Sequence, residues 1–373
     1  MAMASDFEPV LPDYKGACVA NLVPEIVKKM VGFPGADWLP EPVRQAKQVV
    51  LLVIDGLGWD QLEQRQQLAP TLYSGVGGPI TSVCPTTTST VLTSIVTGRA
   101  PGVHGMVGYR MWDMDGILNA LRWEKDGHDA RDTVDPGKFQ TQPAFAANPV
   151  PAILRKEFIG TGFTNAMMQG ANIVGYSALS SVPVEIWRRA RAGDQFIYAY
   201  YDGLDRVAHY NGLQEHYEAE LYTVDRLIRD TMAGLPEGVA LVVTADHGQV
   251  EVGDKLQDLD QEIAQRCWNF SGEARMRWLH LHGGQDHDEI AKLVEQRYGH
   301  EAWVRTRAQV LDEQWFGPTI DDRYVDRLGD IVIAPFADTG YVAPNDHHGD
   351  TLICRHGSLT SAEMMVPLMA LIK

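Results

Sequence analysis

The sequence has few of the features that mark a membrane, secreted or disulfide-linked protein. Its 373 residues include only four cysteines, which are widely scattered without a C-x-x-C pair, so neither a disulfide framework nor a thiolate zinc site is expected. The longest apolar runs, such as residues 49–54, are far too short to span a bilayer. No basic stretch followed by an apolar run opens the chain, so no secretory signal is expected. These absences predict a cytoplasmic protein with free thiols and no membrane partner.

Basic residues are also fewer than acidic ones. The chain has 32 lysines and arginines against 49 acidic residues, which gives a formal net charge of −17. Such a field repels nucleic-acid backbones, so binding to a nucleic-acid duplex is not expected. It is compatible with a small anionic substrate, because bound metal ions can invert the local field. The length suffices for two or three domains, or for one large α/β domain that carries an insertion.

Three short apolar runs predict the strands of a buried parallel sheet. Residues 48–54, 196–202 and 239–246 are rich in β-branched and aromatic side chains, and each run ends at or just before an aspartate. Between the last two, apolar residues recur at helical spacing over 217–232, and Gly234 stands where that helix would stop. The order strand, helix, strand predicts an α/β fold.

The remaining regions are less regular. Residues 111–195 are expected to mix helices with surface loops that cover the sheet. The stretch 255–344 contains strand-like, helix-like and strand-like segments in turn, which predicts a small α/β insertion or cap. The predicted organisation is therefore a catalytic core made of residues 1–254 and 345–373, interrupted by an insertion at 255–344.

Carboxylates and imidazoles gather at the predicted carboxyl edge of this sheet. Asp55, Asp205 and Asp246 lie at or just past three strand ends, where ligands bind in open α/β sheets. His209 follows Asp205 by four residues, on one face of a helical turn, and His247 follows Asp246 directly. A lone aspartate or histidine is more often a cap or a core residue. The matched pairs on one edge are hard to obtain by accident and predict a site for zinc or a similar ion.

A run of hydroxyl side chains lies close to these pairs in the predicted fold. Residues 86–90 read Thr-Thr-Thr-Ser-Thr and precede an apolar helix, so one reading is a simple helix N-cap. The same position also favours phosphate, because free backbone N–H groups and the helix dipole attract anions. A threonine hydroxyl becomes a useful nucleophile when a base or a metal ion lowers its pKa. The neighbouring ligand pairs favour the catalytic reading.

Five motifs make the chain similar to the alkaline phosphatase superfamily, in its nucleotide pyrophosphatase/phosphodiesterase-like branch. They occupy most of the chain, in the order and at the spacing of the family, at residues 51–60, 85–105, 201–212, 244–249 and 355–368. The resemblance implies a three-layer sandwich with a mixed, largely parallel central sheet and a small α+β insertion. It also implies hydrolysis of a phosphodiester or pyrophosphate bond in a small substrate, expected to be a nucleotide.

The resemblance also implies roles for individual residues. The family nucleophile lies nine residues before the threonine of a Thr-Gly pair, here residues 97–98, which selects Thr88. It implies two divalent metal ions, with zinc expected and manganese the alternative. One ion would be held by Asp55, Thr88, Asp246 and His247, the other by Asp205, His209 and His356. His347 and His348 lie near enough to His356 to compete for the last position, and the Arg-His-Gly-Ser context favours His356.

The chain departs from some relatives within the superfamily. A sulfatase would need cysteine or serine at position 88 and arginine at position 92, which is Leu92 here. Familiar nucleotide diesterases carry an asparagine where this chain has Tyr109, whose hydroxyl could donate the same hydrogen bond to a phosphate oxygen. Arg110 is a candidate for the extra cation that a phosphomonoester requires. Both residues are therefore candidate substrate-binding groups.

Several alternatives stay open at this point. A phosphomonoesterase or a phosphonate hydrolase of the same superfamily would use the same framework. A cofactor-independent phosphomutase would prefer a serine nucleophile and a basic substrate domain, and this sequence has neither. A non-catalytic metal- or nucleotide-binding protein would not need all seven metal-site residues, including the nucleophile. The histidine-rich patch at 280–288 is expected to be strand and turn, with a second metal site as the lesser alternative.

Overall fold

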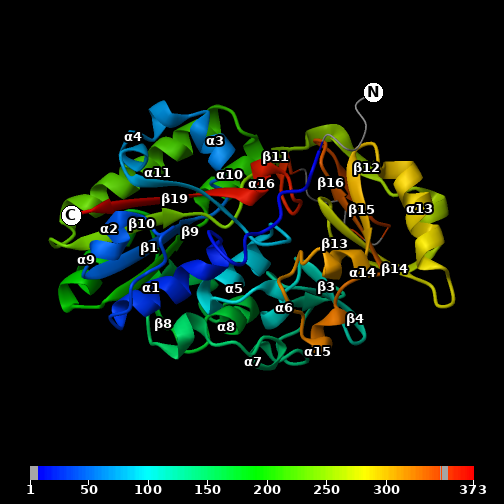
Figure 1. Cartoon of the computed structure of the whole chain (residues 1–373), viewed down its shortest axis with the longest axis horizontal. Helices are drawn as coiled ribbons and strands as arrows, with labels where there is room; N and C mark the ends of the chain where they lie inside the picture. The colour runs from blue at the N-terminus through cyan, green and yellow to red at the C-terminus, as the bar shows by residue number, and fades with distance from the viewer. Residues whose placement is uncertain (1–6, 345, 347–351) are drawn as a thin grey trace.

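A computed structural model of the chain describes residues 7–344, 346 and 352–373 (Figure 1). Among these residues the main sheet has seven strands in the order β2-β19-β10-β1-β9-β7-β8, and β19 runs antiparallel to both of its neighbours. The strands, in chain order, are β1 Gln48–Ile54, β2 Val76–Thr81, β7 Pro151–Arg155, β8 Asn172–Tyr176, β9 Phe196–Tyr201, β10 Val239–Thr244 and β19 Met365–Ile372. The mixed, largely parallel sheet predicted from the sequence is confirmed.

The three predicted strands form the centre of this sheet. β1 lies between β9 and β10 and pairs with both in parallel. Every residue of β9 and β10 is buried, and β1 is buried from its second residue onward. Such continuous apolar runs arise because helices cover both faces of the sheet and leave no face for polar side chains. The shared register brings the carboxyl ends of all three strands to the same edge.

Helices lie on both faces of the sheet and complete the three layers (Figure 1). In that view α3, α4 and α11 lie above the sheet, and α1, α5 and α8 lie below it. The predicted helix at 217–232 is α11, with its apolar stripe buried. The helices of the core are α1 Leu22–Met30, α2 Glu41–Gln45, α3 Trp59–Glu63, α4 Pro70–Tyr73, α5 Thr88–Thr97, α6 Pro101–His104, α7 Pro136–Phe139, α8 Gly162–Met167, α9 Ser181–Ala192, α10 Gly203–Asn211, α11 Glu215–Gly234 and α16 Ser361–Met364.

The region 111–195 differs from the prediction of helices and surface loops. It contributes β7 and β8 to the main sheet, and it also builds an antiparallel sheet, β3-β4-β5-β6, from β3 Arg110–Asp113, β4 Gly116–Asn119, β5 Glu124–Lys125 and β6 His128–Asp129. β8 lies at the edge of the main sheet and is only partly buried. Its sequence therefore lacks the continuous apolar run that identified the central strands.

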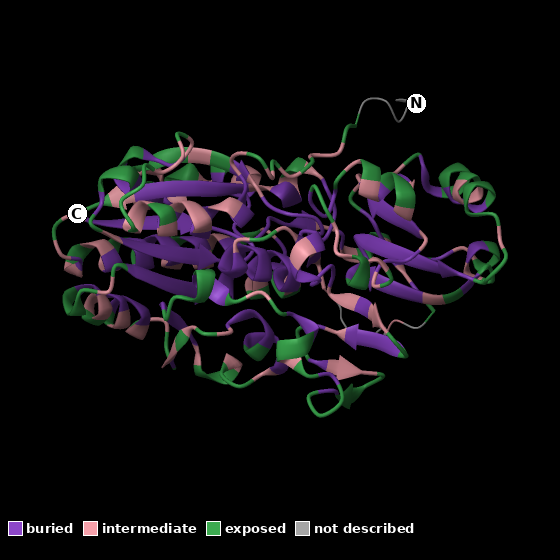
Figure 2. Ribbon diagram, turned by 60° about the horizontal axis from the view of Figure 1, so that its bottom comes forward, coloured by how far each residue is buried: buried purple, intermediate pink, exposed green. Residues whose placement is uncertain are grey.

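The stretch after residue 255 forms a second sheet, in the order β13-β14-β16-β15, beside the main one (Figure 2). A separate hydrophobic cluster, whose members run from Leu259 to Ala343, lies on one face of it, and Trp278 and Val332 on the other face join the main core. The second sheet and this cluster lie within the predicted insertion at 255–344, and the division of the chain into core and insertion stays a prediction. Its elements are β12 Leu256–Asp258, α12 Gln261–Ala264, β13 Cys267–Glu273, β14 Met276–Leu281, α13 His287–Tyr298, β15 Ala302–Thr306, α14 Arg307–Asp312, α15 Asp322–Val325, β16 Ile331–Pro335 and β17 Gly340–Val342.

A buried ion pair joins the insertion to the core. Arg275, in the turn before β14, donates to both carboxylate oxygens of Glu363 at 2.9 and 2.6 Å, and both side chains are completely buried. Arg275 also donates to the backbone carbonyls of Ala337 and Thr339. Because these two buried charges neutralise each other, the pair fixes the position of the sheet β13-β14-β16-β15, the insertion sheet, against α16.

The histidine-rich patch has a structural explanation. His280 on β14 is buried, lies 2.8 Å from Ser271 Oγ through its Nε2, and packs beside Trp112 and Trp268. Burial lowers the pKa of His280 to about 4, so its imidazole is neutral. His287 begins α13. Within the described residues, the groups that could share a metal ion do not include any histidine of 280–288.

Two further observations bear on the setting of the protein. The four cysteines are all buried and all free. Of the helices that the structure describes, none combines the length and the apolar composition needed to cross a membrane.

Candidate metal centre and nucleophile

The shared carboxyl edge of β1, β9 and β10 brings the predicted carboxylates together. Asp55 follows β1, and its backbone N–H donates to Tyr201 O at the end of β9 at 2.9 Å. Asp246 lies two residues past β10, and its Oδ1 accepts hydrogen bonds from the backbone N–H groups of Gly56 and His247. Gly56 has a φ of +73°, and a Cβ there would lie 2.9 Å from the Asp205 Cα. Glycine at this turn thus lets Asp55 approach α10 closely.

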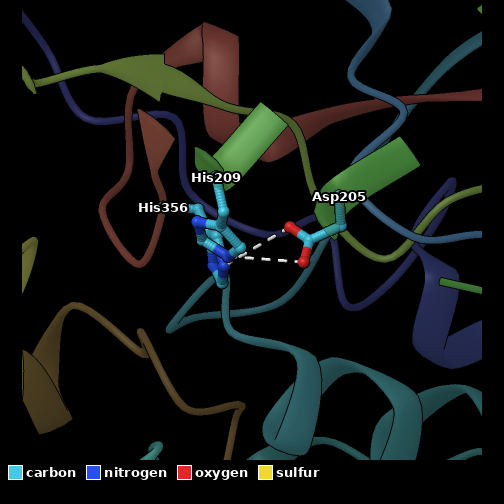
Figure 3. Close-up of side chains that lie close together, drawn as sticks. All are labelled: Asp205, His209 and His356. Atoms are coloured by element: carbon cyan, nitrogen blue, oxygen red, sulfur yellow. Dashed lines mark ion pairs between the residues drawn. The ribbon is translucent and has the colours of Figure 1, made fainter. Parts of the chain in front are cut away.

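The first turns of α10 present the next pair of ligands. Asp205 Oδ2 lies 3.3 Å from His209 Nε2, as their spacing of four residues predicts (Figure 3). Asp202, which directly follows β9, has a different role, because Arg155 and Arg206 both donate to its carboxylate at 2.5 Å. Two guanidinium groups neutralise Asp202, whereas Asp205 faces imidazoles.

His356 reaches the same place from a distant part of the chain. It follows β18 (Cys354–Arg355), which pairs with β11 (Val250–Glu251), and its Nε2 lies 3.8 Å from Asp205 Oδ1 (Figure 3). Its ring stacks on that of His247 with the centroids 3.6 Å apart. His347 and His348, the competing candidates, lie outside the described residues.

Thr88 is the first residue of α5 and points at this group of ligands. Its Oγ1 lies 3.2 Å from His247 Nε2, which in turn lies 3.4 Å from Asp55 Oδ1 and 3.5 Å from Asp246 Oδ2. The hydroxyl also lines a cavity. The structure therefore brings all seven residues of the predicted metal and nucleophile set to one location, with Asp205 common to the two groups Asp205-His209-His356 and Asp55-Asp205-His247.

The three imidazoles are oriented alike by the backbone. Nδ1 of His209 lies 2.7 Å from Cys354 O, Nδ1 of His247 lies 3.0 Å from Gly248 O, and Nδ1 of His356 lies 2.7 Å from Thr86 O. A carbonyl oxygen can only accept, so each Nδ1 carries a proton and each Nε2 is the ring nitrogen left to face the centre of the site. A backbone acceptor behind a neutral imidazole is the usual support of a metal-ligating histidine.

The donor set fits a divalent cation. Asp55 Oδ1 and Asp246 Oδ2 are buried without a hydrogen-bond partner among the described residues. Burial, together with the Asp246 and Asp205 charges, raises the pKa of Asp55, and burial also raises that of Asp246. Burial and the neighbouring His247 and His209 lower the pKa of His356. Buried carboxylates that repel one another are stabilised by a cation between them, and the nearby imidazole nitrogens offer further ligands.

Two supporting residues were not identified from the sequence. The Tyr200 hydroxyl on β9 donates a short hydrogen bond to Asp55 Oδ2, and Gln249 Nε2 donates to Asp205 Oδ1 at 2.5 Å. Gln249 ends one of the family-like motifs, which was the available signal, whereas Tyr200 lies inside a strand where a buried aromatic looks like ordinary core. Each of them orients a carboxylate that is a candidate ligand.

Replacing Tyr200 by phenylalanine tests this support. The change removes one hydroxyl and keeps the ring, so we expect the affinity for zinc to fall about tenfold while the fold is kept. Tyr198→Phe is the matched control, because Tyr198 lies on the same strand, is fully buried, and its hydroxyl has no hydrogen-bond partner among the described residues. Competition with a zinc chelator measures both affinities. Equal affinities in the two variants would contradict a role for Tyr200.

The two candidate substrate-binding residues lie in a different cavity from Thr88. Thr88, Asp205 and His209 line a cavity of about 340 Å³, whereas Tyr109 and Arg110 line one of about 530 Å³. The Tyr109 hydroxyl accepts a hydrogen bond from Asn119 at 2.8 Å, and Arg110 is paired with Asp346. Tyr109 and Arg110 were predicted to be near the nucleophile from their positions in the sequence, which do not determine the direction of their side chains.

A buried hydroxyl at a helix N-terminus, facing carboxylates and imidazoles at the carboxyl edge of a mixed sheet, places the protein among the metal-dependent α/β phosphohydrolases. The family described as type I phosphodiesterase/nucleotide pyrophosphatase matches residues 49–359. The chain therefore belongs to this family, and it is a phosphodiester hydrolase of the alkaline phosphatase superfamily, as its motifs predict. No curated protein sequence matches the chain significantly.

Solved structures show the same fold at low sequence identity. Murine ectonucleotide pyrophosphatase/phosphodiesterase 5 is 18% identical, with a TM-score of 0.64 and coverage of 86% of this chain and 87% of that one. Its inactive threonine-to-alanine variant in complex with AMP is 17% identical, with the same TM-score and coverage. Phosphonoacetate hydrolase from Sinorhizobium meliloti, in complex with phosphonoformate, is 17% identical, with a TM-score of 0.64 and coverage of 88% and 90%.

Proposed function

We propose that the protein hydrolyses phosphodiester or pyrophosphate bonds of small nucleotide-like substrates, with Thr88 as nucleophile and two divalent metal ions. The observation that carries this proposal is the approach of Thr88 Oγ1 to His247 within a group of carboxylates and imidazoles whose lone pairs converge. A binding protein would have no need of a hydroxyl at that point.

The cavity beside Thr88 supports a substrate with a flat apolar part. Its walls combine the ligand-bearing end of α10 with aliphatic and aromatic side chains from α5, β7, α8 and the 3-10 helix Lys156–Phe158, among them Leu92, Leu154, Phe158, Phe163 and Met167. A volume of about 340 Å³ is in the range of small-ligand sites. A nucleobase or another aromatic ring would bury its faces against Phe158 and Phe163 while the phosphoryl group lies at Thr88.

The charges around this cavity favour a diester over a monoester. A monoester brings an additional negative charge to the scissile phosphoryl group and needs a further cation there. Arg206 lines the cavity, but its guanidinium donates to Asp202 at 2.5 Å. In the described part of the chain, this cavity has no other arginine or lysine among its lining residues. We therefore rank phosphomonoester hydrolysis second.

Each residue of the site has a separate role in the proposed reaction. Thr88 Oγ1 gives up its proton to solvent and attacks phosphorus, and the leaving group departs with the electron pair of the broken P–O bond and takes up a proton from water. Water then hydrolyses the phosphothreonyl intermediate, which returns the proton to the threonine oxygen. His247 and the carboxylates hold the hydroxyl in position, and the free N–H groups at the start of α5 bind phosphoryl oxygen atoms. When bound, divalent ions at the two ligand groups would lower the pKa of the hydroxyl and offset the negative charge of the phosphoryl group.

Zinc is the ion that we propose, because three imidazole nitrogens and three carboxylates form a mixed nitrogen and oxygen donor set. Manganese is the alternative, and metal analysis of the purified protein distinguishes the two. We also propose a cytoplasmic location, which the four free thiols support.

Three chromogenic substrates test the proposed reaction. We expect zinc-loaded protein to hydrolyse bis-p-nitrophenyl phosphate and p-nitrophenyl thymidine monophosphate much faster than p-nitrophenyl phosphate, because Thr88 faces an apolar cavity without a spare cation. Faster cleavage of the monoester would change the assignment to a phosphatase. An absence of turnover with two bound metal ions would contradict the proposed catalysis.

A further inference from the structure

The cavity of about 530 Å³ that contains Tyr109 and Arg110 has a polar character that the proposed reaction does not use. It lies between the β3-β4-β5-β6 sheet and the insertion sheet, and four of its lining residues are arginines: Arg110, Arg122, Arg277 and Arg355. In a chain with a net charge of −17, such a concentration of guanidinium groups at one cavity is unexpected.

A pair of arginines shares one carboxylate in the wall of this cavity. Asp346 accepts a hydrogen bond from Arg110 and another from Arg277, the latter at 2.5 Å. Arg277 is 1% exposed, and Arg110 and Asp346 are 20% and 19% exposed. The three side chains therefore carry a net charge of +1 in a setting that is largely shielded from water. A positive charge held in this way attracts an anion strongly, because solvent screens it little.

The two arginines differ in the donors that they have left. Arg277 also donates to the backbone carbonyls of Ser271 and Tyr341, so its position is fixed by the insertion. Arg110, at the start of β3, has no ion pair other than that with Asp346 in the described residues, and its guanidinium has further donors. A guanidinium that is anchored on one side and free on the other is well suited to hold a phosphate or a carboxylate.

The remaining acidic groups do not cancel this charge where the cavity is deepest. Burial raises the pKa of Glu273 to about 8, so that its carboxyl group is largely neutral near pH 7. Glu124 lies on β5 and Asp126 directly follows that strand, and both Asp126 and Arg122 are exposed. Among the charged residues that line the cavity, the exposed ones, Arg122 and Asp126, have opposite charges, whereas the buried one, Arg277, is positive.

Consecutive residues line this cavity and the one that contains Thr88. Leu121 lines the cavity of Thr88 and its neighbour Arg122 lines the arginine-rich one, while Arg355 directly precedes the ligand His356. A Cβ on Gly357 would lie about 3 Å from the Glu273 side chain, so the insertion contacts the loop that carries His356. A substrate with its apolar part beside Phe158 and its phosphoryl group at Thr88 can extend from there toward Arg110.

We infer that the arginine-rich cavity is a second anion-binding subsite, in which Arg110 binds negative charge on the part of the substrate beyond the scissile phosphoryl group. The inference rests on the proposed function for the orientation of the substrate. Two subsites would then determine specificity: the apolar cavity binds one end of the substrate, and the arginine-rich cavity binds negative charge at the other end. Substrates with a charged leaving group are then bound more tightly than those with an uncharged one.

Equilibrium binding tests this subsite without relying on turnover. In zinc-loaded Thr88→Ala protein, the dissociation constants of thymidine 5′-triphosphate and thymidine 5′-monophosphate are measured by calorimetry. We expect Arg110→Gln to weaken binding of the triphosphate about tenfold and to change binding of the monophosphate by less than about twofold. Arg229→Gln, an exposed arginine on α11, is the matched control and should change neither constant.

A variant of Asp346, the carboxylate shared by Arg110 and Arg277, distinguishes a ligand-binding role of Arg110 from a merely structural one. Asp346→Asn keeps an oxygen that accepts from the backbone N–H of Ala343 but removes the charge that competes with the ligand. We expect it to tighten binding of the triphosphate severalfold, opposite in sign to Arg110→Gln. A purely structural ion pair would make both variants less stable and leave the ratio of the two constants unchanged, which would overturn the inference. Failure of the proposed reaction would show instead as absent turnover of the chromogenic diesters.

Discussion

Thr88→Ala is expected to lose turnover of a phosphodiester by about 10³-fold or more. The change removes the hydroxyl that lies 3.2 Å from His247 Nε2 at the start of α5, and no other group in the proposed reaction can form the covalent intermediate. The fold and the bound metal should be kept, because the remaining carboxylates and imidazoles do not depend on this hydroxyl for their orientation. Steady-state hydrolysis of bis-p-nitrophenyl phosphate and metal analysis of the same sample measure both quantities.

The control for this variant comes from the same helix. Thr90 is two residues further along α5, is completely buried, and its hydroxyl has no hydrogen-bond partner among the described residues. Thr90→Ala therefore removes a similar group from a similar environment and should keep most of the activity. A Thr88→Ala variant as active as Thr90→Ala would refute a threonine nucleophile at position 88.

Asp205→Asn is expected to abolish most of the activity through loss of metal. Asp205 belongs to both groups of candidate ligands and lies 3.3 Å from His209 Nε2 and 3.8 Å from His356 Nε2. An amide in its place keeps the shape but removes the charge that attracts a cation. We expect less than half of the zinc content of the unaltered protein after dialysis, and a fall in kcat/KM of more than about 10³-fold.

A matched acidic residue far from the site serves as the reference for this loss. Asp230→Asn removes a carboxylate from the exposed side of α11, where it pairs with Arg226 and Arg229, and should leave the zinc content unchanged. Elemental analysis of both variants after identical dialysis makes the comparison. Full zinc content and activity in Asp205→Asn would contradict the assignment of Asp205 as a ligand.

The central part of the fold was predictable from the sequence because it is locally encoded. β1, β9 and β10 are buried on both faces, so their continuous apolar runs stand out, and the shared edge of parallel strands then places Asp55 and Asp246 together. The spacing of Asp205 and His209 on one helical turn is equally local. β8 was missed because it lies at the edge of the sheet and is only partly buried. β7 is buried, but its apolar run of Ala-Ile-Leu is short and follows a proline, so it does not stand out.

The candidate reacting groups were thus identified from the sequence, whereas their orientation and the shape of the cavities were decided by the tertiary structure. No local pattern shows that Tyr200 supports Asp55, that backbone carbonyls orient the Nε2 atoms of the three histidines toward one point, or that Arg155 joins Arg206 in neutralising Asp202. The two cavities depend on segments more than 200 residues apart, as the pairing of Arg110 with Asp346 shows. The direction of a long side chain depends on which distant charge it meets, and only the folded chain determines that.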